Sequence, residues 1–158
     1  MRKPTDDLSE YHKHLLETVA EHGVHITYVA PASGRGAGMA FTVGLWEKYE
    51  QPEVVVFGLE PDGAHDLLNA IADECAEDRR FADGEKHDDL LVGYSVRFVA
   101  VPPEQVVEHC HGMTWAYEDK PVPCVQLVWP DKNRRWPWQE GVREGFRKVQ
   151  PVLGNVPS

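Results

Sequence analysis

The sequence lacks the features that place a protein in a membrane or route it out of the cell. Its 158 residues contain no apolar run of about 18 residues, the length needed to span a bilayer. The first residues, MRKPTDDLSEYHK, hold no apolar segment typical of a secretory signal, and their acidic side chains differ from those of a transit peptide. We therefore predict a cytoplasmic protein that does not bind membranes.

Cysteines are also few, and their spacing matches no common ligand pattern. The chain has three, Cys75, Cys110 and Cys124, an odd number without a CxxC pair. Free thiols in a reducing compartment are therefore expected, rather than a disulfide framework or a structural zinc site. A chain of this length can bury a hydrophobic core without such cross-links.

Positive charge is scarce over most of the chain. The formal net charge is −10, which opposes the approach of a polyanion and argues against nucleic-acid binding. Residues 131–148 are the exception, because they carry six cations and three acids, leaving +3 there and −13 elsewhere. This local excess indicates either a solvated surface or a patch that binds anions.

Hydrophobic periodicity predicts alternating helices and strands. Helices are expected at residues 5–22 and 61–75 and from residue 102 to near residue 112, and strands at residues 24–29, 39–45, 53–59, 90–101 and 123–129. The segment 77–89 is polar and rich in turn formers, so we expect a connection there.

These elements indicate an α+β fold in a single domain spanning residues 1–158. The expected sheet is mixed or mainly antiparallel, with about five strands packed by two to three helices. Closure of this sheet into a partial barrel is an alternative. A C-terminal tail at 143–158 is expected to be partly helical.

Two short motifs suggest chemistry that their surroundings do not favour. The glycine-rich GRGAG at 34–38 lies between two expected strands, so we predict a flexible loop, with a lid that brings Arg35 to an anion as the alternative. His109, Cys110 and His111 are good metal ligands by type. On a helix, however, residues two apart point in nearly opposite directions, so a metal site is the minor reading.

Strand alternation offers a better candidate site. If Ile26, Phe41, Val43, Val96 and Phe98 face one core layer, the other sheet face collects His25, Thr27, Thr42, Ser95, Arg97 and Gln126. Such groups can bind an anionic or amide-bearing ligand, and histidine can exchange a proton near neutral pH. A solvent-exposed polar face of the sheet is the alternative.

Several phrases, in this order, are similar to a known bacterial family. They are EHGVHITYV, AFTVGLWEKYEQPEVVVFGL, LLNAIAD, FADGE, LLVGYSVRFVAV and QLVWPDKNRRWPW. Together they resemble the domain of unknown function DUF4262 over roughly residues 20–142. The most specific marks are Phe41–Leu45, Pro52 with Glu53, Leu68 with Asn69, Trp129–Asp131, and Pro137 with Trp138.

The resemblance implies a small, cytosolic bacterial domain and supplies no activity. Val24 departs from the pattern, because a bulky aromatic residue often follows the His-Gly pair. The TVGL-to-FGL hairpin also resembles flavin-binding split barrels, but only at the level of fold, which does not fix function.

The first functional hypothesis is a small-ligand domain, with or without enzymatic activity. Its pocket would use His25 for proton transfer and Thr42, Arg97 and Gln126 as polar contacts. Trp129 and Trp138 would form aromatic walls, and Arg35 would contact an anion. No motif implies a cofactor, and flavin, haem and metal all remain open.

The second hypothesis is a protein-interaction module of a regulatory or immunity type, with a homodimer as one form. Arg134, Arg135 and Trp136 would form its contact surface, because arginine and aromatic residues are favoured interface anchors. A metal site at His109, Cys110 and His111 is the third.

Overall fold

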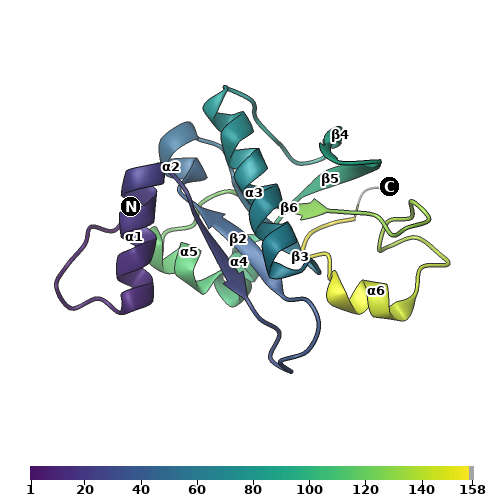
Figure 1. Cartoon of the computed structure of the whole chain (residues 1–158), viewed down its shortest axis with the longest axis horizontal. Helices are drawn as coiled ribbons and strands as arrows, with labels where there is room; N and C mark the ends of the chain where they lie inside the picture. The colour runs from purple at the N-terminus through teal and green to yellow at the C-terminus, as the bar shows by residue number, and fades with distance from the viewer. Residues whose placement is uncertain (157–158) are drawn as a thin grey trace.

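The structure is a computed structural model that describes residues 1–156 and contains one six-stranded sheet with helices on both faces (Figure 1). The helices are α1 (Glu10–His22), α2 (Leu45–Tyr49), α3 (Pro61–Ala76), α4 (Pro103–His109), α5 (His111–Ala116) and α6 (Glu144–Val149). The strands are β1 (His25–Val29), β2 (Met39–Val43), β3 (Glu53–Phe57), β4 (Lys86–Leu91), β5 (Tyr94–Ala100) and β6 (Cys124–Val128). Within residues 1–156 no helix has the length and apolar character to cross a membrane.

The sheet is open, with the strand order β1-β2-β3-β6-β5-β4. Strands β3 and β6 pair in parallel, whereas the other neighbouring pairs are antiparallel. The α+β class and the mixed, mainly antiparallel sheet are therefore confirmed. The strand number is six rather than five, and the sheet ends at two edges, β1 and β4, instead of closing into a partial barrel.

The additional strand, β4, begins in the segment 77–89 that was predicted to be a polar connection and ends at Leu91. The single strand predicted at 90–101 was therefore wrong, because a turn at Val92 and Gly93 divides it between β4 and β5. Strand β4 reads KHDDLL and pairs with β5, with its charged side chains exposed or half-buried. A strand at a sheet edge needs no apolar alternation, and charged residues there discourage pairing with another chain. For this reason the hydrophobic pattern does not reveal it.

Helix α1 has the predicted apolar face but starts later than expected. Ser9 caps it, since its hydroxyl accepts a hydrogen bond from the His12 amide at 3.1 Å, and the helix ends at Gly23. Leu15 and Leu16 are buried on the sheet side. The stretch 5–8 precedes the helix, so the prediction that the helix opens at Thr5 or Asp6 was wrong.

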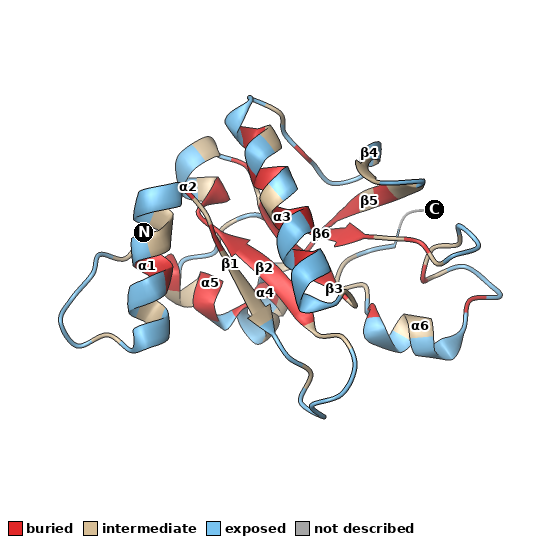
Figure 2. Ribbon diagram, in the orientation of Figure 1, coloured by how far each residue is buried: buried red, intermediate tan, exposed pale blue. Residues whose placement is uncertain are grey.

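Two hydrophobic layers cover the two faces of the sheet, and buried residues concentrate along them (Figure 2). Helix α3 covers one face with a stripe of buried side chains, which are Ala64, Leu67, Leu68, Ile71, Ala72 and Cys75. The other face packs against α1, α4 and α5, through residues that include Leu15, Val106 and Met113. The apolar stripe predicted for residues 61–75 is confirmed.

Strand registers divide the polar residues differently from the predicted alternation. Ile26 pairs with Thr42, so Thr42 belongs to the α3 side of the sheet. His25 pairs with Val43, a residue of the opposite layer. Phe41 and Val43 therefore do not share a face with Ile26, and the single polar face expected from alternation is not present.

The C-terminal segment is bound to the central strand β6 by two buried glutamines. The Gln126 side chain donates to the Pro151 carbonyl at 2.7 Å and accepts from the Leu153 amide at 2.9 Å. The Gln150 side chain bonds both backbone groups of Trp129, at 2.9 and 2.8 Å. Residues of the expected C-terminal tail thus complete the packing of the sheet.

Candidate functional site

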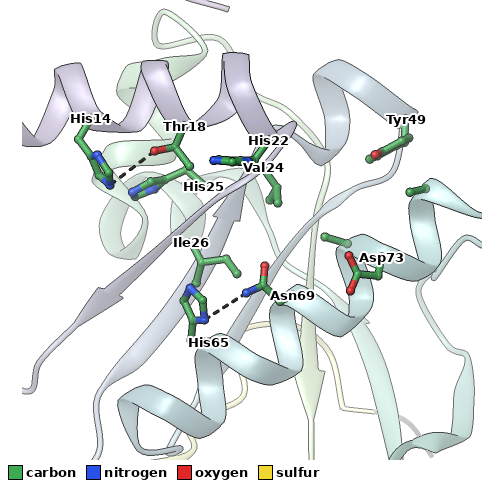
Figure 3. Close-up of a pocket in the computed structure, with 12 residues that line it drawn as sticks. His14, Thr18, His22, Val24, His25, Ile26, Tyr49, His65, Asn69 and Asp73 are labelled. Carbon is green, nitrogen blue, oxygen red and sulfur yellow. Dashed lines mark hydrogen bonds between the residues drawn. The ribbon is translucent and has the colours of Figure 1, made fainter.

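A cavity of about 520 Å³ lies over the edge strand β1, between helices α1 and α3 (Figure 3). Its lining residues are His14, Thr18, His22, Val24, His25, Ile26, Tyr49, His65, Asn69, Ala72, Asp73 and Ala76. Because β1 is an edge strand, both helices can reach past it, and they enclose the space from its two sides. We call this space the histidine pocket.

Four imidazoles line the histidine pocket. His14 and His22 come from α1, His25 from β1 and His65 from α3. The His14 and His25 rings meet edge to face, with centroids 5.4 Å apart. His25 is buried at 7% exposure, whereas the other three are exposed.

The buried imidazole has an altered proton affinity. The pKa of His25 is lowered from 6.5 to about 4, chiefly by burial and to a smaller extent by electrostatic repulsion from the nearby His14 and His65. His25 is therefore neutral at physiological pH, with one ring nitrogen able to donate and the other able to accept a hydrogen bond.

A chain of hydroxyl groups fixes one side of the His25 ring. The Tyr11 hydroxyl lies 2.7 Å from Thr27 Oγ1, which lies 3.2 Å from His25 Nδ1. Gly112 makes this arrangement possible, because a Cβ atom at that position would lie 2.1 Å from the Tyr11 hydroxyl.

The other ring nitrogen, Nε2, has no hydrogen-bond partner among residues 1–156. It is also not enclosed, since the enclosed side-chain atoms without a partner are Nε of Arg97 and Nε of Arg135. Nε2 of His25 is therefore an accessible polar atom without a partner, on a residue that lines the histidine pocket.

Apart from Tyr49, which ends α2, the remaining polar groups of the pocket lie on α1 and α3. On α1, His14 Nε2 lies 3.5 Å from the Thr18 hydroxyl, and on α3, His65 Nδ1 lies 3.1 Å from Asn69 Nδ2. Asp73 supplies a carboxylate. Among the described residues no group of three or more His, Cys, Asp or Glu side chains is arranged to hold a metal ion.

The His-Cys-His sequence does not form a site either. His109 ends α4 and packs edge to face on Phe57, with centroids 5.7 Å apart, whereas His111 begins α5 and is exposed. Cys110 is buried between them, and burial raises the pKa of its thiol to about 12. A thiol that stays protonated is a poor metal ligand.

Thr42 and Gln126, two of the predicted ligand contacts, are used inside the fold. The Thr42 hydroxyl donates to Glu53 Oε1 at 2.8 Å and accepts from the Val54 amide at 2.9 Å. Gln126 binds the C-terminal segment. The structure therefore does not bring these two residues to His25.

Glu53 forms a second polar region, which is fully buried. Its carboxylate accepts hydrogen bonds from the Thr42 and Tyr117 hydroxyls and from three consecutive backbone amides. These amides open helix α2 and belong to Gly44, Leu45 and Trp46, at 2.8, 3.1 and 3.3 Å. We call this region the Glu53 centre.

Burial and hydrogen bonding act in opposite directions on the Glu53 carboxyl. Burial raises its pKa, and the hydrogen bonds from Tyr117 and the α2 amides oppose that rise. Gly44 has a φ of 121°, and a Cβ atom there would lie 2.3 Å from the Gly23 carbonyl oxygen. Only glycine fits where the chain turns over the carboxylate. The Glu53 centre thus explains why the TVGL phrase and Glu53 occur together.

The predicted aromatic walls and Arg35 also lie away from His25. Trp129 donates its indole N–H to the Phe57 carbonyl at 2.8 Å and packs on Phe146. Trp138 stacks on Trp136, with centroids 5.7 Å apart. Arg35 is exposed in the loop between β1 and β2, beside a separate shallow hollow.

The predicted interface residues lie in the loop that follows β6. Arg97 of β5 places its guanidinium 5.4 Å from the centre of the Trp136 ring, so a predicted pocket residue in fact joins this cluster. Arg134 lies 5.2 Å from the ring of Tyr94. Arg135 instead approaches Asp131 at 3.5 Å and supports the turn.

Of the residues predicted to contact a ligand, His25 lines the histidine pocket, whereas its neighbours there were not among the predicted residues. A signal exists, because His14, Thr18 and His22 recur at every fourth position, and so do His65, Asn69 and Asp73. Residues with this spacing form one stripe along a helix. Two polar stripes on helices that otherwise pack by apolar faces indicate a shared polar space.

One comparison with known proteins gives a match. The family model described as "Domain of unknown function (DUF4262)" matches residues 18–143, which is more than half of the chain. The chain therefore belongs to this family. No curated protein and no solved structure matches it.

Proposed function

We propose that this member of the DUF4262 family binds a small anionic ligand in the histidine pocket, and that His25 takes up a proton when the ligand binds. The observation that carries the proposal is the state of His25. It is buried and neutral, it lines the cavity, one ring nitrogen is held by Thr27, and the other has no hydrogen-bond partner among residues 1–156. A polar atom without a partner at the wall of a cavity is a typical feature of a binding site.

The lining favours an anion over a cation. Four imidazoles can donate hydrogen bonds, and Asp73 is the one carboxylate among the lining residues. Electrostatic repulsion from His14 and His65 contributes to the lowered pKa of His25. An anion reverses this effect, because it stabilises the charged form of each ring that it contacts.

Neutral groups give the pocket a second kind of contact. Asn69 and Thr18 can hydrogen-bond hydroxyl or amide groups of a ligand, and Val24 and Ile26 provide an apolar surface. A ligand with one anionic end and a short polar or apolar body would match this lining. The size of the space, about 520 Å³, lies in the range of small-molecule sites.

Calorimetric titration with inorganic phosphate and with short mono- and dicarboxylates tests the proposal. Binding should be tighter at pH 6 than at pH 8, and the heat should depend on the ionisation enthalpy of the buffer, with an uptake of up to about one proton per ligand. His25→Ala should weaken binding by about tenfold or more, because the imidazole donor is lost.

His111→Ala is the matched control. This imidazole is exposed on α5 and does not line the pocket, so its removal should leave the affinity unchanged. The proposal would be rejected if none of these anions binds, or if their binding is independent of both pH and His25.

A further inference from the structure

A second surface lies toward the other end of the sheet from the histidine pocket. It is formed by Tyr94 and Arg97 of β5 and by Arg134, Trp136 and Trp138 of the loop between β6 and α6. We call it the cationic aromatic surface. Strand β5 is separated from β1 by three other strands, so the two regions do not share residues.

Four arginines lie at or beside the cationic aromatic surface, and their contacts divide them into two kinds. Arg135 approaches Asp131, and Arg147 approaches Glu144 at 3.8 Å while it donates to the Pro137 carbonyl. These arginines hold the loop together. Arg97 and Arg134 have no carboxylate within ion-pair distance among residues 1–156, and each lies over an aromatic ring instead.

The aromatic rings are held in place by the loop. Asp131 accepts hydrogen bonds from the Asn133 and Arg135 amides at 2.9 Å each, and Gln139 accepts one from the Trp136 amide at 2.7 Å. Trp136 and Trp138 then stack within 10° of parallel. A surface fixed in this way loses little conformational entropy when a partner binds.

We propose that the cationic aromatic surface docks an acidic segment of a protein partner. Tryptophan, tyrosine and arginine are the residues that most often dominate binding energy at protein interfaces. The two arginines without a carboxylate partner would pair with glutamate or aspartate side chains, and the stacked indoles would cover apolar side chains between them. This proposal is independent of the ligand in the histidine pocket.

Charge makes other partners less suitable. The region 131–148 carries +3, but the rest of the chain carries −13, which would repel a long polyanion such as a nucleic acid. A symmetric contact between two copies of this chain would place Arg97 and Arg134 against the same cations. A short acidic segment avoids both costs, because it meets the positive region alone.

Fluorescence anisotropy with a labelled peptide of alternating glutamate and phenylalanine tests this surface. The peptide should bind the full-length protein at low salt, less tightly at high salt, and less tightly when its glutamates are replaced by glutamine. Trp136→Ala and Arg134→Ala should each weaken binding by about tenfold. Arg134 is exposed, so its removal leaves folding intact and the test remains valid if Trp136→Ala is unstable.

Arg35→Ala is the control, because this exposed arginine lies in the loop between β1 and β2. Equal peptide binding by wild type and by both surface variants would overturn the proposal, as would absence of binding. Preference for heparin over the peptide would assign the surface to a polyanion and also overturn it. Self-association that Trp136→Ala abolishes in light scattering would assign it to a second copy, with the same consequence.

Discussion

The Glu53 centre and the histidine pocket both place a titratable side chain inside the fold, but they differ in how many of its polar atoms are used. The two oxygens of Glu53 accept hydrogen bonds from five donors, and the residue is fully buried. His25 uses one ring nitrogen, the other has no partner among residues 1–156, and the residue lines a cavity. The first arrangement is a structural cap, whereas the second leaves a polar atom of a buried residue without a partner.

The comparison shows that burial of a polar residue does not indicate function by itself. A buried group is stable when it has partners, and it is then unavailable for anything else. What distinguishes His25 is an unused atom beside a cavity. The contrast between a closed and an open polar region can be tested by removing each in turn.

Removal of the Glu53 carboxylate should have the largest effect. Glu53→Ala leaves the amides of Gly44, Leu45 and Trp46 without their acceptor, and the hydroxyls of Thr42 and Tyr117 as well. We expect the free energy of unfolding in urea to fall by about 3–5 kcal/mol, because several buried donors lose their partner together.

Two variants serve as references for this loss. Glu47→Ala removes an exposed carboxylate from α2, the helix whose first amides bind Glu53. It should change the free energy of unfolding by less than about 0.5 kcal/mol. Glu53→Gln keeps one acceptor oxygen and should lie between the two. If Glu53→Ala is as stable as Glu47→Ala, the Glu53 centre is not the structural cap described here.

Acidification should affect the histidine pocket less strongly. The pKa of His25 is about 4 in the folded protein and 6.5 without burial, so the unfolded chain binds more protons between these values. The contribution of neutral His25 to stability is present above pH 6.5 and is lost as the pH falls to about 4. We expect a loss of about 2 kcal/mol, reduced from the full shift because solvent enters the open pocket.

Comparison with His25→Asn separates this loss from the titration of other groups. Between pH 6.5 and 4 the free energy of unfolding in urea should decline less steeply for the variant than for the wild type. The carboxyl groups that also titrate in this range are the same in both proteins. His25 faces His14 and Tyr11 from α1 and His65 from α3, and none of these changes in the variant. Parallel stability profiles would show that His25 titrates as it would in water.

The smallest effect is expected for the hydroxyl chain behind His25. Tyr11→Phe removes a hydroxyl from a residue that is 39% exposed, so the free energy of unfolding should change by less than about 1 kcal/mol. The balance of the two neutral tautomers of His25 should nevertheless shift, since Thr27 is free to reorient. Nitrogen NMR of the imidazole measures this balance, with Tyr94→Phe as the control. An unchanged spectrum would show that the hydroxyl groups of Tyr11 and Thr27 do not orient the His25 ring.

Much of the fold could be predicted from the sequence because its helices and central strands have strong periodicity. Helix α3 shows an apolar stripe and β3 a continuous apolar run, and both occur where expected. Edge strand β4 could not be found in this way. Its half-buried side chains, His87, Leu90 and Leu91, do not alternate with the exposed ones, so its pattern does not distinguish it from a loop.

The candidate site was predicted less completely, for a different physical reason. A sequence shows that Thr42, Gln126 and His25 are polar, but it does not show which atoms are already bonded. Thr42 is used by Glu53, and Gln126 by the C-terminal segment, so of the three only His25 lines the histidine pocket. Only the folded chain shows which side chains of α1, β1 and α3 lie around the same pocket.

The hydrogen bonds made by Gln126 and Gln150 limit how far the C-terminal segment can be shortened. The family match ends at residue 143, but the partners of Gln126 and of the Trp129 backbone come from residues 150–153. A fragment cut at the family boundary would keep every matched residue and still expose unbonded amides in the central strand. The unit to clone and crystallise is therefore longer than the unit that the family model recognises.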